Sequence, residues 1–209
     1  PSEGSWTYVM ATFVDSTDEV NLYINGVGES MTDSHSNSPN SEAVMIGRHV
    51  NSPEAYFFNG SIDEVLIYNR SLNVSEVNDL YKVGLSQHGN ANVTLKTRTA
   101  SSYNISDSGL VEIFGFNNDN STIAFGEKGT INGTKVGGLN DATESDGIVG
   151  KGYHFERNND YINLGNDSAI NLNTFTYSMW VWRTTPTDSI NQLITRNAGY
   201  SGWSLYAVG

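Results

Sequence analysis

Cysteine, basic residues and long apolar runs are scarce in this 209-residue sequence, and each scarcity narrows its possible structures and functions. Cysteine is absent, which excludes disulfides, thiolate metal sites and cysteine nucleophiles together. Basic residues number 11 against 23 acidic ones, and a net charge of -12 would repel a nucleic-acid backbone. No apolar run approaches the roughly 18 residues of a spanning helix, and no signal-peptide pattern precedes Pro1. We therefore expect no nucleic-acid partner and no membrane-spanning segment.

The residues that are abundant favour short strands joined by tight turns. Gly occurs 21 times and Tyr 11 times, while only 16% of the residues are charged. An aromatic content of 11% is higher than disordered segments carry. This composition predicts an all-β protein.

Alternation of side-chain type marks the predicted strands. The turn-forming pair Asn25-Gly26 predicts a hairpin after the second strand, and the spacing within 152–165 predicts another through 157–159. A polar loop is expected at 29–42. The predicted strands are 6–14, 20–24, 43–47, 62–68, 92–100, 110–116, 152–165 as a hairpin, 175–185, 192–196 and 203–208.

One segment changes from strand to helix periodicity. Asn73 followed three residues later by Glu76 is similar to a capping box, in which each side chain satisfies a backbone N–H at the helix start. Val77, Leu80 and Tyr81 follow at the spacing of an apolar helical stripe. This pattern predicts one short helix.

Several segments together resemble the laminin-G-like, concanavalin A-like jelly roll, but in swapped order. WTYVMATF, NLYINGV, VMIGR and FNGSIDEVLIYNRSLNVSEVNDLY resemble the second half of such a domain. LVEIFGFNND, GKGYHFERNNDYINLG and FTYSMWVWRTT resemble its first half. The resemblance implies an antiparallel β-sandwich with one short helix.

The swapped order divides the chain into residues 1–82 as a second half, 83–107 as a linker with one strand, and 108–209 as a first half. Two explanations fit: a circularly permuted domain, or a segment of a tandem array that runs from one repeat into the next. We favour the array, because Pro1 and Gly209 both fall inside what resembles a domain. Half a sandwich leaves its inner face uncovered, so we expect self-association with neighbouring repeats or subunits.

The resemblance also implies a structural calcium ion, with Asp63, Glu64 and Asp119 as its candidate ligands. Hard oxygen ligands suit this ion. In this family the second acidic ligand usually follows the phenylalanine of the first strand, whereas Asn117 and Asn118 follow Phe116 here. The alternative is that Asp63 and Glu64 form a solvated or turn-stabilising acid pair.

A group of aromatic residues is the candidate for glycan binding or for an interface. Trp180 and Trp182 share a strand face with Thr176 and Ser178, and Trp6 and Tyr8 are expected on the same sheet. In lectins of this architecture, aromatic rings on a concave sheet stack on sugars. Burial in the core or beneath a neighbouring subunit is the alternative, and the commoner one.

The sequence contains no recognisable set of catalytic residues, so we expect a protein without enzymatic activity. The four histidines lack metal-ligand spacing, there is no GxSxG elbow, and no strand carries clustered catalytic acids. The leading hypothesis is an extracellular or cell-surface structural or adhesive module of a repetitive surface or filament protein; the rival is a carbohydrate-binding domain of a secreted protein. Candidate glycosylation sites are Asn59, Asn69, Asn73, Asn92, Asn104, Asn120, Asn132 and Asn166.

Overall fold

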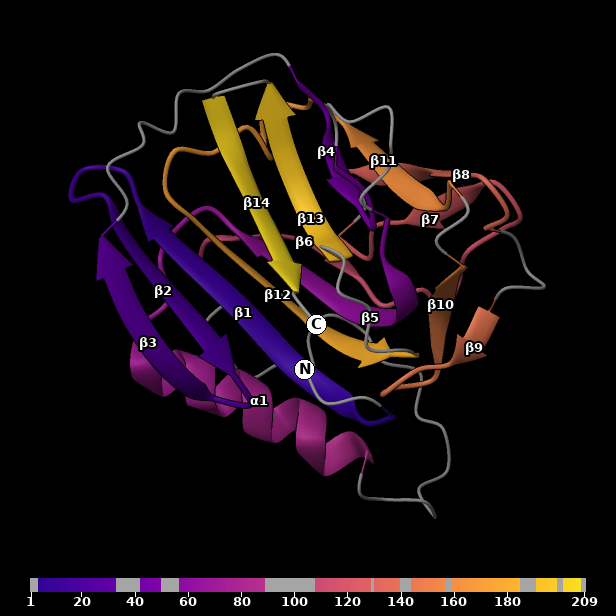
Figure 1. Ribbon diagram of the computed structural model, residues 1–209, viewed down its shortest axis with the longest axis horizontal. Helices are drawn as coiled ribbons and strands as arrows, with labels where there is room; N and C mark the ends of the chain where they lie inside the picture. Colours follow the sequence, from indigo (N-terminus) through magenta and orange to yellow (C-terminus); the bar gives the residue numbers. More distant parts are fainter. Residues whose placement is uncertain are drawn as a thin grey trace.

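Two antiparallel sheets pack face to face, and one helix lies on the outer side of the larger sheet (Figure 1). The computed structural model describes residues 4–32, 42–49, 57–88, 108–128, 130–139, 144–156, 159–184, 191–198 and 201–207. Within these ranges the predicted all-β sandwich with one helix is confirmed.

The order of strands in each sheet differs from their order in the chain. The larger sheet runs β3 (Val27–Thr32), β2 (Glu19–Ile24), β1 (Trp6–Val14), β12 (Phe175–Arg183), β5 (Asn59–Tyr68), β10 (Lys151–Glu156) and β9 (Glu144–Asp146), with β6 (Leu110–Phe114) also pairing with β5. The smaller sheet runs β14 (Ser201–Ala207), β13 (Asn191–Ala198), β4 (Val44–Ile46), β11 (Tyr161–Gly165), β8 (Asn132–Val136) and β7 (Ile123–Phe125).

The two regions that resemble half domains share both sheets. β12 pairs with β1 from Trp6↔Trp182 to Phe13↔Phe175, and its other side pairs with β5. In the smaller sheet, β4 lies between β13 and β11. Each of the two regions therefore supplies strands to both sheets, and in each sheet a strand of one region lies between two strands of the other region.

The hairpin predicted at Asn25-Gly26 is confirmed. Both residues have positive φ, 51° and 79°, as a type I′ turn requires, and β2 and β3 pair on either side. The returning strand β3 reaches Thr32, so the first residues of the predicted polar loop are a strand instead. The rest of that loop, at 33–41, lies outside the described residues.

The second predicted hairpin, within 152–165, is wrong. β10 belongs to the larger sheet and β11 to the smaller one, so the chain crosses between the sheets here. Asp160 stabilises the crossing, since its Oδ2 accepts the Glu156 N–H at 2.9 Å and its Oδ1 accepts the Gly138 N–H at 2.5 Å. Alternation shows that each strand has one buried face, but it does not identify the strand's partner.

The helix α1 (Val74–His88) begins as the sequence predicts but is longer. Asn73 Oδ1 accepts the N–H groups of Ser75 and Glu76 at 2.9 and 3.1 Å, and Glu76 Oε2 accepts the Asn73 N–H at 2.9 Å. Residues 83–88, predicted as the start of the linker, form its last turns. A Cβ on Gly84 would lie only 2.5 Å from Trp180 Nε1, so the absence of a side chain lets the helix approach the sheet closely.

Two apolar clusters form the core. One fills the space between the sheets, and the other lies between the larger sheet and α1. The predicted strand at 92–100 lies outside the described residues, whereas β7, β8 and β9 arise in a glycine-rich stretch where the sequence predicted no strand.

Candidate binding site

The predicted aromatic group does assemble on one face of the larger sheet. The Trp6 and Trp182 rings are 6.0 Å apart, and those of Tyr8 and Trp180 are 5.2 Å apart. However, Tyr8 and Trp180 are only 2% and 3% exposed, and Tyr81 of α1 stacks on Trp180 at 5.9 Å. Tyr8 and Trp180 are therefore core residues, and only Trp6 and Trp182 remain half-buried.

Asp63 is fully buried and stabilises the turn between β9 and β10. Its Oδ1 accepts the Glu64 N–H at 2.7 Å, and its Oδ2 accepts the Val149 N–H at 3.0 Å. Burial and the neighbouring Glu64 raise the pKa of Asp63 well above its usual range, although these backbone hydrogen bonds act in the opposite direction. This geometry corresponds to the turn-stabilising alternative.

Asp119 has a similar role in the loop between β6 and β7, where its Oδ1 accepts the Phe125 N–H at 2.8 Å. Two of the three candidate calcium ligands thus already accept hydrogen bonds from backbone N–H groups. Among the side chains that the structure describes, no group of three or more His, Cys, Asp or Glu residues could hold a metal ion. Calcium binding stays a prediction.

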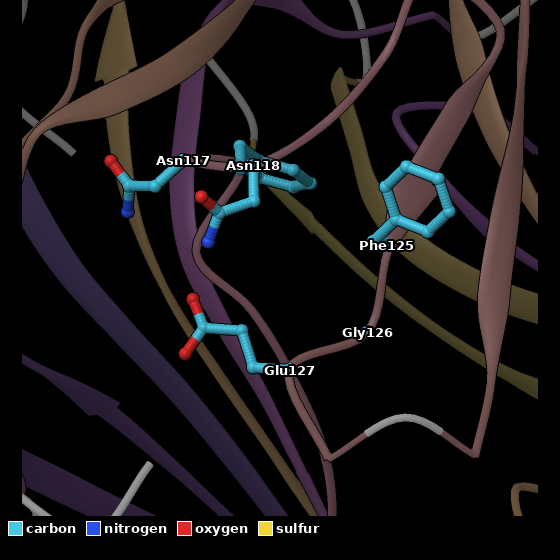
Figure 2. A pocket seen from close by; sticks show the side chains of 6 residues that line it. Asn117, Asn118, Phe125, Gly126 and Glu127 are labelled. Carbon is cyan, nitrogen blue, oxygen red and sulfur yellow. The ribbon is translucent and has the colours of Figure 1, made fainter. Parts of the chain in front are cut away.

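A pocket of about 240 Å³ lies at the edge of the smaller sheet, between the β6–β7 loop and the residues after β7 (Figure 2). Figure 2 shows the amide groups of Asn117 and Asn118 on the same side of the pocket as the carboxylate of Glu127. The Phe125 ring, 38% exposed, stands on the other side. The lining residues are Phe116, Asn117, Asn118, Phe125, Gly126 and Glu127.

A buried carboxylate fixes one wall of this pocket. Glu112 on β6 is fully buried, and it accepts the N–H groups of Lys128 at 2.7 Å and Ile131 at 3.0 Å and the Thr130 hydroxyl at 2.8 Å. The segment that carries Gly126 and Glu127 is therefore held by charge-assisted hydrogen bonds. Glu112 was not among the predicted site residues, although a lone acid within the apolar segment LVEIF is a signal for such a role.

The other wall is also preorganised. Asn117 donates from Nδ2 to the Gly115 carbonyl at 2.7 Å and accepts the Lys151 N–H at 2.9 Å. Gly126 is required because an added Cβ would lie 2.1 Å from the Ile131 carbonyl oxygen. The exposed Asn118 and the half-buried Glu127 are the polar groups placed to meet a ligand.

An aromatic ring facing amide and carboxylate groups suits a ligand with one apolar and one hydroxyl-rich side. The ring offers stacking contact, and the polar groups fix orientation through hydrogen bonds. Sequence reasoning missed this pocket because its residues come from a loop and from the end of a strand that was not predicted.

The candidate glycosylation sites differ in accessibility. Asn59 is half-buried within β5, and Asn92 and Asn104 lie outside the described residues. The remaining candidates are exposed: Asn69, Asn73, Asn120, Asn132 and Asn166.

The comparisons with known proteins agree with this architecture. Residues 1–78 match a laminin G family model described as the concanavalin A-like lectin/glucanases superfamily. No curated protein and no solved structure matches the sequence. In the described part of the chain, no helix is long and apolar enough to cross a membrane. Residues 1–78 are therefore similar to laminin G domains, and the all-β sandwich of the described residues is consistent with the concanavalin A-like fold.

Proposed function

We propose that the protein is a non-catalytic adhesive module that works outside the cell and binds glycans through the Phe125 pocket. One observation carries this proposal: an exposed aromatic ring and hydrogen-bonding side chains face one preorganised pocket in a lectin-like sandwich. The match over residues 1–78 supports a binding module in general.

The charges around the pocket narrow the glycan class. Glu127 lines the pocket, and the chain carries a net charge of -12. Both disfavour sialylated or sulfated glycans, because like charges at short range repel. The proposed ligand is a neutral or amino sugar whose apolar face stacks on Phe125 and whose hydroxyls contact Asn118 and Glu127.

The same residues support binding without hydrolysis. Glycosidases use two carboxyl groups on either side of the scissile bond. Glu127 is the one carboxylate among the lining residues, and the nearby Glu64 is only 3% exposed. We therefore expect no release of reducing sugar from bound polymers.

A glycan array with fluorescently labelled full chain tests the proposal. We expect saturable binding that Phe125→Ala and Asn118→Ala each reduce at least tenfold. Tyr206→Ala is the matched control, since Tyr206 is an exposed aromatic residue (51%) on β14, at the other end of the smaller sheet. If Trp182→Ala loses glycan binding and Phe125→Ala keeps it, the binding site is at the half-buried pair Trp6 and Trp182 and not at the Phe125 pocket. An array without saturable binding would overturn glycan recognition.

A structural role in a repetitive surface or filament protein is the second proposal. It is supported by the interleaving of the two regions, because β12 lies between β1 and β5. Exchange of these regions between chains would link subunits head to tail. Light scattering across a concentration series tests this: masses that are multiples of 22.8 kDa support exchange, and a constant 22.8 kDa contradicts it.

A further inference from the structure

The four strands that end the main order of each sheet differ in charge and length, while β6, which pairs with β5 outside this order, carries Glu112. The larger sheet ends at β3, which carries Glu29, and at β9, which has two acids in three residues. The smaller sheet ends at the three-residue β7 and at β14, a seven-residue strand with neither charge nor proline. Proteins usually protect edge strands by charge, proline or shortness. Of these four edges, β14 has none of these protections.

One side of β14 presents its backbone groups outward. The Trp203 carbonyl accepts the Thr195 hydroxyl at 3.2 Å, so it faces β13. Backbone groups of successive residues point to opposite sides of a strand. The N–H and C=O groups of Gly202, Ser204 and Tyr206 therefore point away from β13, where β14 ends the sheet.

The larger sheet extends beyond β14. The Trp203 ring lies 4.9 Å from Phe175 and 4.3 Å from Tyr177, which places β14 over β12. β1, β2 and β3 follow β12 outward in the larger sheet (Figure 1). No described strand of the smaller sheet lies beyond β14 to cover β2 and β3.

The inner face of β2 and β3 carries three exposed apolar residues, Ile24, Val27 and Met31, which we refer to as the β2–β3 floor. Ile24 pairs with Val27 in the register, and Val20, which packs against the inter-sheet core, pairs with Met31. The exposed fractions are 50% for Ile24, 77% for Val27 and 50% for Met31. In the described part of the chain, the edge strand β14 and an exposed apolar surface therefore lie on the same side of the sandwich.

The shape of this region limits what can occupy it. A strand added to β14 would continue the smaller sheet about 4.8 Å further out, over β1 and toward the floor, with about 10 Å between the two sheets. A second copy pairing through its own β14 would bring its own larger sheet into the space that β1–β3 already occupy. A lone extended segment fits, whereas a whole sandwich does not.

We propose that β14 binds an extended segment of another polypeptide by strand addition, with apolar side chains of that segment directed toward the β2–β3 floor. Glu29 lies opposite Leu22, between Val27 and Met31 on the same face. Together with the net charge of -12, it favours a segment with a Lys or Arg between its apolar residues. This surface and the Phe125 pocket lie at opposite ends of the smaller sheet, and neither depends on the other.

Fluorescence anisotropy with the labelled peptide Ser-Val-Thr-Lys-Thr-Val-Ser and the full chain tests the proposal. We expect saturable binding below about 1 mM that Ser204→Pro, which removes an outward N–H, weakens at least tenfold. Ser204→Ala keeps that N–H and should bind like the wild type. Val27→Lys changes a 77% exposed residue, so it should fold normally and still weaken binding. Glu29→Lys should reverse the preference between this peptide and its Lys-to-Glu counterpart.

Absence of saturable peptide binding would overturn the proposal. Equal binding by Ser204→Pro and Ser204→Ala would also overturn it, and so would undiminished binding by Val27→Lys. Light scattering without peptide gives an independent check. A concentration-dependent dimer that Ser204→Pro abolishes would make a second copy the occupant, and would contradict the inference of a lone segment.

Discussion

The larger sheet is covered by α1 on the outer face of β1, β2 and β12, whereas its inner face is exposed at β2 and β3. On its outer face, Tyr8, Tyr23 and Trp180 are buried with Val77 and Leu80 of α1. On its inner face, the β2–β3 floor is exposed by half or more. Successive side chains of a strand point to opposite faces, so β2 contributes Tyr23 to the covered face and Ile24 to the exposed one. The chain itself therefore covers the outer face at β1, β2 and β12, whereas the floor faces the side on which we propose that a partner segment binds.

The largest expected effect on stability comes from separating the two regions whose strands alternate in the larger sheet. Cutting the chain near residue 90 should leave two fragments without a cooperative thermal transition, because β12 would be lost from between β1 and β5 and both would expose apolar sheet faces. Circular dichroism melts of 1–90 and 91–209 measure this. A sharp transition in either fragment would show that one region folds without the other.

The next effect separates the closed face from the open one. Trp180→Ala should lower the free energy of unfolding by about 4 kcal/mol, because Trp180 is buried against Tyr8 and Tyr81. Val27→Ala should change it by less than about 0.5 kcal/mol, as expected for an exposed position. Urea unfolding measures both. Similar losses in the two variants would contradict the distinction between the faces.

A smaller effect is expected from the pH dependence of stability. The raised pKa of Asp63 means that the native state binds more protons than the unfolded state between about pH 4, the ordinary carboxyl value, and the raised value. The contribution of Asp63 to the free energy of unfolding should therefore fall as pH rises through this window. Asp63→Asn should remove that part of the slope in urea titrations from pH 4 to pH 7. An unchanged slope would assign the proton uptake to other groups.

Calcium is expected to have the smallest effect. A Cβ on Gly115 would lie 3.2 Å from Glu64 Oε1 and 2.4 Å from Glu127 Oε1, so these two carboxylates approach one another. If the resemblance to the family extends to its ion, millimolar Ca²⁺ should raise the melting temperature by a few degrees, because ligands that bind the native state stabilise it. Glu64→Gln should remove this shift. An unchanged melting temperature of the wild type in millimolar Ca²⁺ would contradict a stabilising calcium site.

Local features of the fold could be predicted from the sequence because the residues that form them are adjacent. Asn73 and Glu76 predict the helix start, and Asn25-Gly26 predicts the hairpin; both depend on contacts within a few residues. Strand partners could not be predicted, since the alternation in β10 and β11 indicates a buried face but not which sheet it belongs to.

The candidate site was harder to predict for related reasons. β12 has aromatic residues on both faces, so the sequence could not show whether Trp180 faces a ligand or the helix. The Phe125 pocket depends on Glu112, which is 14 residues before Gly126 and orders its loop through several backbone N–H groups. Such long-range hydrogen bonds leave no periodic pattern.

The claim that one chain closes its own sandwich can be tested directly because the sequence contains no cysteine. Trp6 and Trp182 are register partners on β1 and β12 and are half-buried, so their Cβ atoms should lie about 5 Å apart. The Trp6→Cys/Trp182→Cys variant, oxidised at micromolar concentration, should form an intrachain disulfide and run as a single 22.8 kDa species on non-reducing electrophoresis. A ladder of disulfide-linked multimers would show that β1 and β12 pair between chains; it would contradict closure within one chain and support the exchange of regions between subunits.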